Sequence, residues 1–106
     1  MAEVVWSVDA TRDLASIHAY ISQQSAEYAD AVISRLIEAV SNLADFPELG
    51  RVVPEYGQTR LRELLFQNYR IVYRFPLGPG LVGIVGVVHG AVDLRRRAQR
   101  QRWDLA

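Results

Sequence analysis

The first half of the chain has the apolar spacing of two amphipathic helices. In residues 9–24, apolar side chains recur every three to four positions, which places them on one face of a helix. In residues 26–44 the apolar stripe continues without a break over about four turns. Asp9 and Ser25 precede these stripes and are suited to be N-caps, because their oxygens accept hydrogen bonds from the open amides of a first helical turn. The short link between the two predicts an antiparallel helical hairpin.

Strand patterns precede the hairpin once and follow it three times. The four segments are residues 3–7, 60–66, 69–75 and 81–88. Phe46-Pro47 ends the second helix, because a residue before proline is disfavoured in the α conformation. Segment 69–75 alternates cleanly, and one face carries the residues expected to pack on the hairpin: Tyr69, Ile71, Tyr73 and Phe75. Segment 81–88 is apolar on both faces, so we expect a central strand covered on both sides.

These elements predict an α+β domain. The order is β-α-α-β-β-β, with an N-terminal strand and an antiparallel helical hairpin packed on a small, mainly antiparallel sheet, followed by a basic C-terminal tail. At 106 residues the chain has the size of a single domain, which we expect to span residues 1–106. The tail from Asp93 to about Trp103 is rich in arginine and is compatible with a short helix.

Composition indicates a cytoplasmic protein. Half of the residues are hydrophobic, enough for a packed globule, yet no apolar run approaches the roughly 18 residues of a membrane span. The N-terminus has no basic stretch followed by an apolar one, so no secretory signal is expected. The sequence contains no cysteine, which excludes disulfides, thiolate metal sites and cysteine nucleophiles.

The formal net charge of zero conceals two halves of opposite charge. Residues 1–50 carry eight acids and two arginines, a balance of −6, and residues 51–106 carry ten arginines and four acids, a balance of +6. All basic residues are arginine, whose planar fork binds carboxylates and phosphates through two hydrogen bonds. The second half is therefore suited to an anionic partner, although a GC-rich genome also explains the absence of lysine.

Several motifs occur together in one order and cover residues 4–93. They are Asp13-Leu14-x-x-Ile17-x-x-Tyr20-Ile21, Phe46-Pro47-x-x-Gly50-Arg51, Arg62-Glu63-Leu64, Asn68-Tyr69-Arg70-Ile71-Val72-Tyr73-Arg74 and Val87-Val88-His89-Gly90. In this order they resemble the RelE/ParE superfamily of bacterial type II toxins. The resemblance implies a small toxin that is neutralised by a cognate antitoxin, with no cofactor and no metal.

The resemblance implies one of two activities. RelE-like toxins cleave messenger RNA on the ribosome with basic and aromatic side chains, whereas ParE-like toxins bind and inhibit DNA gyrase. If the chain is a ribonuclease, its candidate catalytic residues are Arg62, Arg70 and His89. That set is incomplete: Glu63 follows Arg62 where a positive residue is expected, and no tyrosine occurs beyond Tyr73. The missing residues, the zero net charge and the long hairpin favour the ParE-like branch, with a degenerate toxin that retains only antitoxin binding as a further alternative.

The basic residues give the candidate partner-binding sites. They are Arg51, Arg62, Arg70, Arg74, Arg95 and Arg96, together with Trp103 near the C-terminus. Arg70 and Arg74 are expected on one strand face, with Arg62 on the neighbouring strand within reach. They form either an anion-recognising patch or cross-strand pairs with Glu63 or a helix acid, and the sequence leaves both open.

The two histidines have structural explanations as well as a functional one. His89 follows the last strand and is either a general acid/base or a strand-end residue bonded to the backbone, which we favour. His18 is expected on or beside the packed helical stripe.

Overall fold

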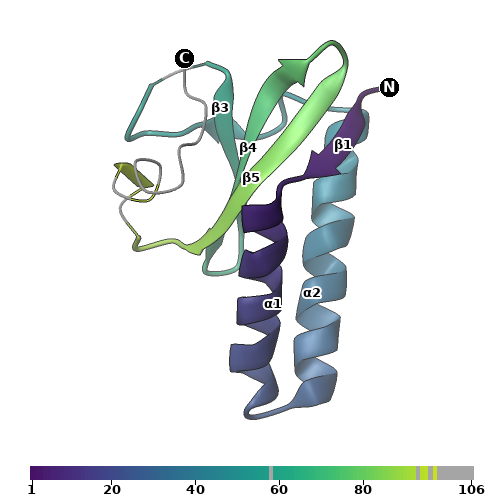
Figure 1. Ribbon diagram of the computed structural model, residues 1–106, viewed down its shortest axis with the longest axis vertical. Coiled ribbons are helices and arrows are strands. Elements are labelled where there is room, and N and C mark those ends of the chain that lie inside the picture. The colour runs from purple at the N-terminus through teal and green to yellow at the C-terminus, as the bar shows by residue number, and fades with distance from the viewer. Residues whose placement is uncertain (58, 93, 96, 98–106) are drawn as a thin grey trace.

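In the computed structural model, two helices lie side by side against one face of a five-stranded sheet (Figure 1). The structure describes residues 1–57, 59–92, 94, 95 and 97, and the statements below concern these residues. The elements are β1 (Glu3–Trp6), α1 (Val8–Ser22), α2 (Ala26–Ser41), a 3-10 turn η1 (Asn42–Ala44), β2 (Arg51–Val52), β3 (Leu61–Phe66), β4 (Tyr69–Gly78) and β5 (Leu81–His89). The predicted α+β class and helical hairpin are confirmed.

The sheet has the order β1-β5-β4-β3-β2. β1 pairs in parallel with β5, with Glu3 opposite Leu81 and Trp6 opposite Ile84, and the other three pairings are antiparallel. The mainly antiparallel sheet is therefore confirmed, and β5 lies inside it as predicted. The two-residue strand β2 was not expected as a strand, because so short a segment has no alternation to recognise.

The helix starts follow from capping. Ser25 caps α2 as predicted, and its Oγ accepts from the Tyr28 amide at 3.1 Å. The prediction that Asp9 caps α1 was wrong: Ser7 has the extended backbone of an N-cap, and its Oγ accepts from the Ala10 amide at 3.0 Å. Asp9 lies in the first turn instead, where its negative charge is favourable next to the helix N-terminus.

Each face of the sheet has its own core. On the helix side, residues of both helices pack on β4 and β5, and the fully buried Tyr73 lies at the centre of this core, with Tyr69 and Phe75 packed partly buried around it. Their predicted role as core residues is confirmed. The opposite face carries a smaller cluster: Val53, Leu61, Val72, Val88 and Leu94. The loop after β2 and the segment after β5 therefore cover the second face of the central strand.

The helical hairpin is longer than the sheet it packs on. Figure 1 shows the connection between α1 and α2 projecting well past the strands. Within the ranges that the structure describes, no helix is long and apolar enough to cross a membrane.

Candidate functional site

A shallow depression of about 400 Å³ lies where the β3–β4 turn meets the end of β5. Its lining includes three of the predicted site residues, Arg51, Arg70 and His89, together with Glu55 and Tyr69. The strand register explains why these residues lie close together. Tyr69 of β4 pairs with His89 of β5, and Arg70 of β4 pairs with Leu65 of β3. Residues that are far apart in sequence thus meet at one end of the sheet.

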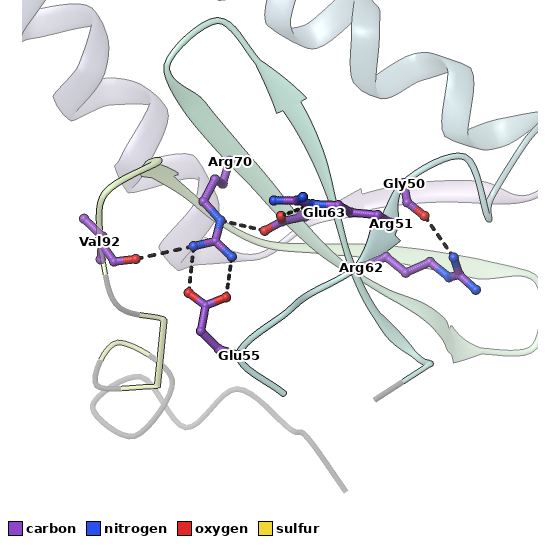
Figure 2. A network of polar contacts seen from close by, with 7 residues as sticks. All are labelled: Gly50, Arg51, Glu55, Arg62, Glu63, Arg70 and Val92. Atoms are coloured by element: carbon purple, nitrogen blue, oxygen red, sulfur yellow. Dashed lines mark hydrogen bonds and ion pairs between the residues drawn. The ribbon is translucent and has the colours of Figure 1, made fainter. Parts of the chain in front are cut away.

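Arg70 is bound on both sides by carboxylates (Figure 2). Its Nη1 and Nη2 donate to the two oxygens of Glu55 at 2.7 and 2.6 Å, and its Nε donates to Glu63 at 2.6 Å. Nη1 also lies 3.5 Å from the carbonyl oxygen of Val92. The residue is only 7% exposed. The sequence left open an anion-recognising patch or a pair with Glu63, and the structure places Arg70 in that pair and in a second one with Glu55.

Glu63 joins this pair to a second arginine. The carboxylate is fully buried, and its other oxygen accepts from Nε of Arg51 at 2.6 Å. We call Arg51, Glu55, Glu63 and Arg70 the charge network; it contains two cations and two anions and has no formal net charge. Its hydrogen bonds fix the ionisation states: the bond from Arg70 lowers the pKa of Glu55 from 4.5 to about 2, and the bond to Glu55 raises the pKa of Arg70 above its usual value.

Arg51 is the exposed member of the network. It belongs to β2, and its side chain is 56% exposed. Because buried Glu63 holds Nε, the guanidinium is kept at the rim of the depression. Arg51 is also opposite Glu63 in the pairing of β2 with β3, so the ion pair joins two neighbouring strands.

Arg62 lies on the other face of the sheet. Its register partner is Tyr73, which faces the helices, whereas Arg74 is opposite Leu61 on the face of the second core. Nη1 of Arg62 donates to the Gly50 carbonyl at 2.9 Å. The expectation that Arg62 lies within reach of Arg70 and Arg74 was therefore wrong. Side chains of paired residues lie on the same face of a sheet, so Arg62 lies on the helix side with Tyr73, whereas Arg70 and Arg74 lie on the opposite face.

The remaining candidates are dispersed. Arg74 is buried, at 7% exposure, under the second core, and Arg95 is exposed beyond β5. Arg96 and Trp103 lie outside the residues that the structure describes. Contact of any of these side chains with a partner stays a prediction.

The histidines occupy the positions expected of them, at a strand end and beside the helical stripe. His89 stacks edge-on against Tyr69 at 6.2 Å, and its Nδ1 accepts from the Ala91 amide at 3.3 Å. This backbone bond is the structural role that the sequence favoured. His18 bridges the two helices through a 2.6 Å contact of Nε2 with Asp30. Among the described residues, no three histidine, aspartate or glutamate side chains gather as a metal site would require.

The contacts of two acids, Glu55 and Asp13, were not foreseen from the sequence. Glu55 lies in a loop rich in turn formers, 15 positions before its partner Arg70, and no periodicity connects them. Asp13 lies on the helical stripe, yet its Oδ2 accepts from the Val87 amide at 2.8 Å and its Oδ1 pairs with Arg97 at 2.5 Å. The signals for Asp13 were its place at the start of a motif shared with the RelE/ParE superfamily and an acid in an otherwise apolar helical face.

Known proteins resemble this chain over most of its length. Residues 4–94 match the family described as "ParE toxin of type II toxin-antitoxin system, parDE". The chain is 38% identical over 91 residues to a protein named Toxin RelE2 from Caulobacter vibrioides, an alignment that covers 86% of this chain and 98% of the relative. A solved structure from P. aeruginosa, titled as its chromosomal ParDE system, superposes with a TM-score of 0.67 at 20% identity, covering 84% of this chain and 96% of the other.

The solved structure supports the fold, and the sequence matches support the family. The motifs that suggested the RelE/ParE superfamily fall within the matched residues 4–94. Family membership implies an antitoxin partner. The chain belongs to the ParE toxin family, within the RelE/ParE superfamily, and is the toxin of a type II toxin–antitoxin system.

Proposed function

We propose that this toxin inhibits DNA gyrase by binding it, without catalysing RNA cleavage, and that a cognate antitoxin neutralises it. The observation that carries the proposal is the charge network around Arg70. Both edges of the Arg70 guanidinium are occupied by carboxylates at 2.6–2.7 Å.

The network is unsuited to RNA cleavage for an electrostatic reason. Metal-free cleavage requires positive charge at the scissile phosphate and a positioned proton donor and acceptor. A phosphate arriving at Arg70 must displace the bidentate Glu55 carboxylate, and it meets a cluster whose two arginines are balanced by two acids. Such a site offers no net attraction to a polyanion.

The candidate ribonuclease residues also do not converge. Arg70 and His89 line one depression, but Arg62 faces the helix side of the sheet. No described pocket combines all three. This dispersion supports a toxin that acts by binding.

The test is plasmid supercoiling by purified gyrase with the isolated, folded toxin added. We expect loss of supercoiling or accumulation of cleaved DNA, reversed by the antitoxin. A His89→Ala variant is the matched control, because a binding toxin has no need of an acid/base at that position and should inhibit equally. Undisturbed supercoiling at a clear molar excess of folded toxin contradicts the proposal.

Ribosome-dependent RNA cleavage is the second candidate. It is favoured by the meeting of Arg51, Arg70 and His89 in one depression, and by a relative that bears the name RelE2. Cleavage of messenger RNA on ribosomes, lost in His89→Ala, would replace gyrase inhibition as the activity. Inactivity in both assays with intact antitoxin binding identifies a degenerate toxin.

A further inference from the structure

The outer half of the helical hairpin does not belong to the core that packs on the sheet, although Ala29 and Val32 of α2 are fully buried there. The helix-side core takes Ala10, Leu14 and Ile17 from α1 and Leu36 and Val40 from α2, and none of its members falls between residues 18 and 35. This half projects beyond the strands in Figure 1. Packing on the sheet therefore does not explain about one and a half turns at the end of α1 or about three turns at the start of α2.

The projecting end, residues 20–30, is a fixed structure, and we call it the hairpin tip. Ser25 caps α2 through the Tyr28 amide, and the amides of Gln24 and Ser25 both return to the Ile21 carbonyl, at 3.0 and 3.2 Å. Next to the tip, His18 links α1 to Asp30 of α2 at 2.6 Å. A surface whose backbone is already ordered loses little conformational entropy when it binds a partner.

The hairpin tip exposes two tyrosines. Tyr20 is 72% exposed and Tyr28 is 53% exposed. Both line a hollow of about 250 Å³, together with Ile21, Gln23 and Gln24. Tyrosine offers a large apolar ring with a polar hydroxyl at low entropic cost, and it is enriched among the residues that dominate binding energy. Two such rings around one hollow are the chemistry of a protein-binding surface.

The charge of this region is negative. No lysine or arginine occurs between Arg12 and Arg35, whereas Glu27 and Asp30 are exposed at the tip. Opposite charge on the partner would favour encounter and fix its orientation. The tip therefore fits a positively charged surface better than an acidic one.

We propose that the hairpin tip is the surface through which the toxin holds its target, and that the complementary surface is an arginine- and lysine-rich protein surface that receives Tyr20 and Tyr28. This rests on the proposed function in one respect: a DNA-handling enzyme such as gyrase carries basic surfaces for DNA phosphates. The charge network, on the sheet face away from the helices, then has a structural role, and the antitoxin is left to other surfaces.

The test compares the double variant Tyr20→Ala/Tyr28→Ala with Phe46→Ala, a matched control that removes a similarly exposed ring (65%) from the segment after η1, at the other end of α2. Alanine favours helix, so the double variant should keep its melting temperature. Four quantities are measured: growth arrest on expression, the inhibitory concentration in the supercoiling assay, antitoxin affinity and melting temperature. We expect the double variant to lose growth arrest and to need at least about ten times more protein to inhibit gyrase, with antitoxin affinity unchanged. Phe46→Ala should behave as wild type.

A charge variant tests the sign of the partner. Glu27→Arg should weaken inhibition at low salt, and the difference from wild type should shrink as salt screens the charges. If Glu27→Arg inhibits gyrase at low salt as well as wild type or better, the surface that the tip contacts is not basic.

The outcomes separate this inference from the proposed function. If wild type arrests growth without affecting gyrase, the proposed function fails, and loss of arrest in the double variant still assigns the tip to the target. If the double variant stays toxic, or if it loses the antitoxin instead, the tip is not the target surface. A wild-type chain that leaves growth unaffected overturns both.

Discussion

At the scale of single residues, Glu63 is the side chain with the most demanding environment. Its carboxylate has no exposed surface, and each oxygen accepts from a different arginine at 2.6 Å. A buried ion gains stability only when its charge and its lone pairs are satisfied, and removal of one partner leaves an uncompensated charge. The stability of the β2–β3–β4 end of the sheet therefore depends on this one side chain.

Glu63→Gln should destabilise the fold. The neutral amide keeps the shape of the side chain but leaves buried Arg70 with a single carboxylate, and we expect a loss of about 3 kcal/mol in the free energy of unfolding. Urea denaturation measures the loss. The control is Glu38→Gln, an exposed acid of α2, for which we expect a change below about 0.5 kcal/mol. Equal stability of the two variants contradicts the role given to Glu63.

Glu55 should make stability depend on acid pH. Its pKa is lowered from 4.5 to about 2 in the folded state, mainly by the hydrogen bond from Arg70. A carboxyl with a depressed pKa stabilises the fold at pH values above its unfolded pKa, and this contribution is lost as pH falls from about 4.5 toward 2. The loss amounts to at most about 3 kcal/mol. Unfolding free energies measured across this range should fall less steeply in Glu55→Gln than in wild type.

The residue scale is also where sequence reasoning reached its limit. A pair between Arg70 and Glu63 was foreseeable, because both lie on adjacent strands of clear alternation. The second pair with Glu55 was not, because the path of an irregular loop in space is not encoded in any local period. Arg62 was misplaced for a related reason: the alternation along each strand is visible in sequence, but the register between strands is not.

At the scale of elements, the loop between α2 and β2 is held to the sheet by one phenol. Tyr73 on β4 accepts from the Gly50 amide at 2.9 Å, and its hydroxyl donates to the Pro47 carbonyl at 2.8 Å. Burial raises the pKa of Tyr73, so the hydroxyl keeps its proton and can donate. Gly50 lies against this hydroxyl so closely that an added Cβ would be 2.8 Å from it and 2.5 Å from the Glu63 carbonyl.

Gly50→Ala should therefore lower thermal stability. The methyl group has no space, and the loop must move away from Tyr73, at a cost of about 2 kcal/mol. The matched control is Gly78→Ala on the same β4, where an added Cβ meets only the flexible Leu81 side chain at an ordinary 3.4 Å. Differential scanning calorimetry should show a clear fall in melting temperature for the first variant and little change for the second. A Gly50→Ala protein that melts with wild type would mean that the loop is held by other contacts.

Most helices and strands could be predicted from the sequence, because apolar positions recur in them at regular spacing over a long enough stretch. The two helices and strands β3, β4 and β5 each contain several repeats of an apolar position, and packing against the sheet preserves those repeats. The N-cap of α1 is Ser7 and not the predicted Asp9. Both residues are good N-caps and lie two positions apart, and the local sequence does not decide between them. The coverage of the second sheet face depends on Val53 and Leu94, single apolar residues in segments without any period.

At the scale of the whole molecule, Asp13 connects three distant parts of the chain. From α1, its carboxylate receives the Val87 amide of β5 and pairs with Arg97 beyond that strand. The Val87 amide lies past the last residue that β1 pairs, where the edge of β5 has no neighbouring strand. The aspartate thus replaces the missing strand at this position.

Asp13→Asn should weaken this connection. The amide oxygen can still accept from Val87, but the ion pair with Arg97 is lost, so we expect a loss of about 1–2 kcal/mol. Hydrogen exchange of the Val87 amide should accelerate relative to wild type, while the Tyr28 amide, capped by Ser25 far from this site, should be unaffected. Unchanged exchange at Val87 contradicts the edge-covering role of Asp13.

The neighbouring positions of β1 and β5 have a consequence for when the toxin becomes active during its synthesis. β1 is made before the other strands of the sheet and its partner residues 81–84 belong to the last of them, so β1 to β4 must all be made before the sheet closes. Contacts between such distant segments form late and slow the search for the native state. A nascent chain that has only reached β4 has helices and apolar strands but no β5 between β1 and β4. We expect no folded toxin to exist on the ribosome before residues 81–84 have been made and can pair with β1.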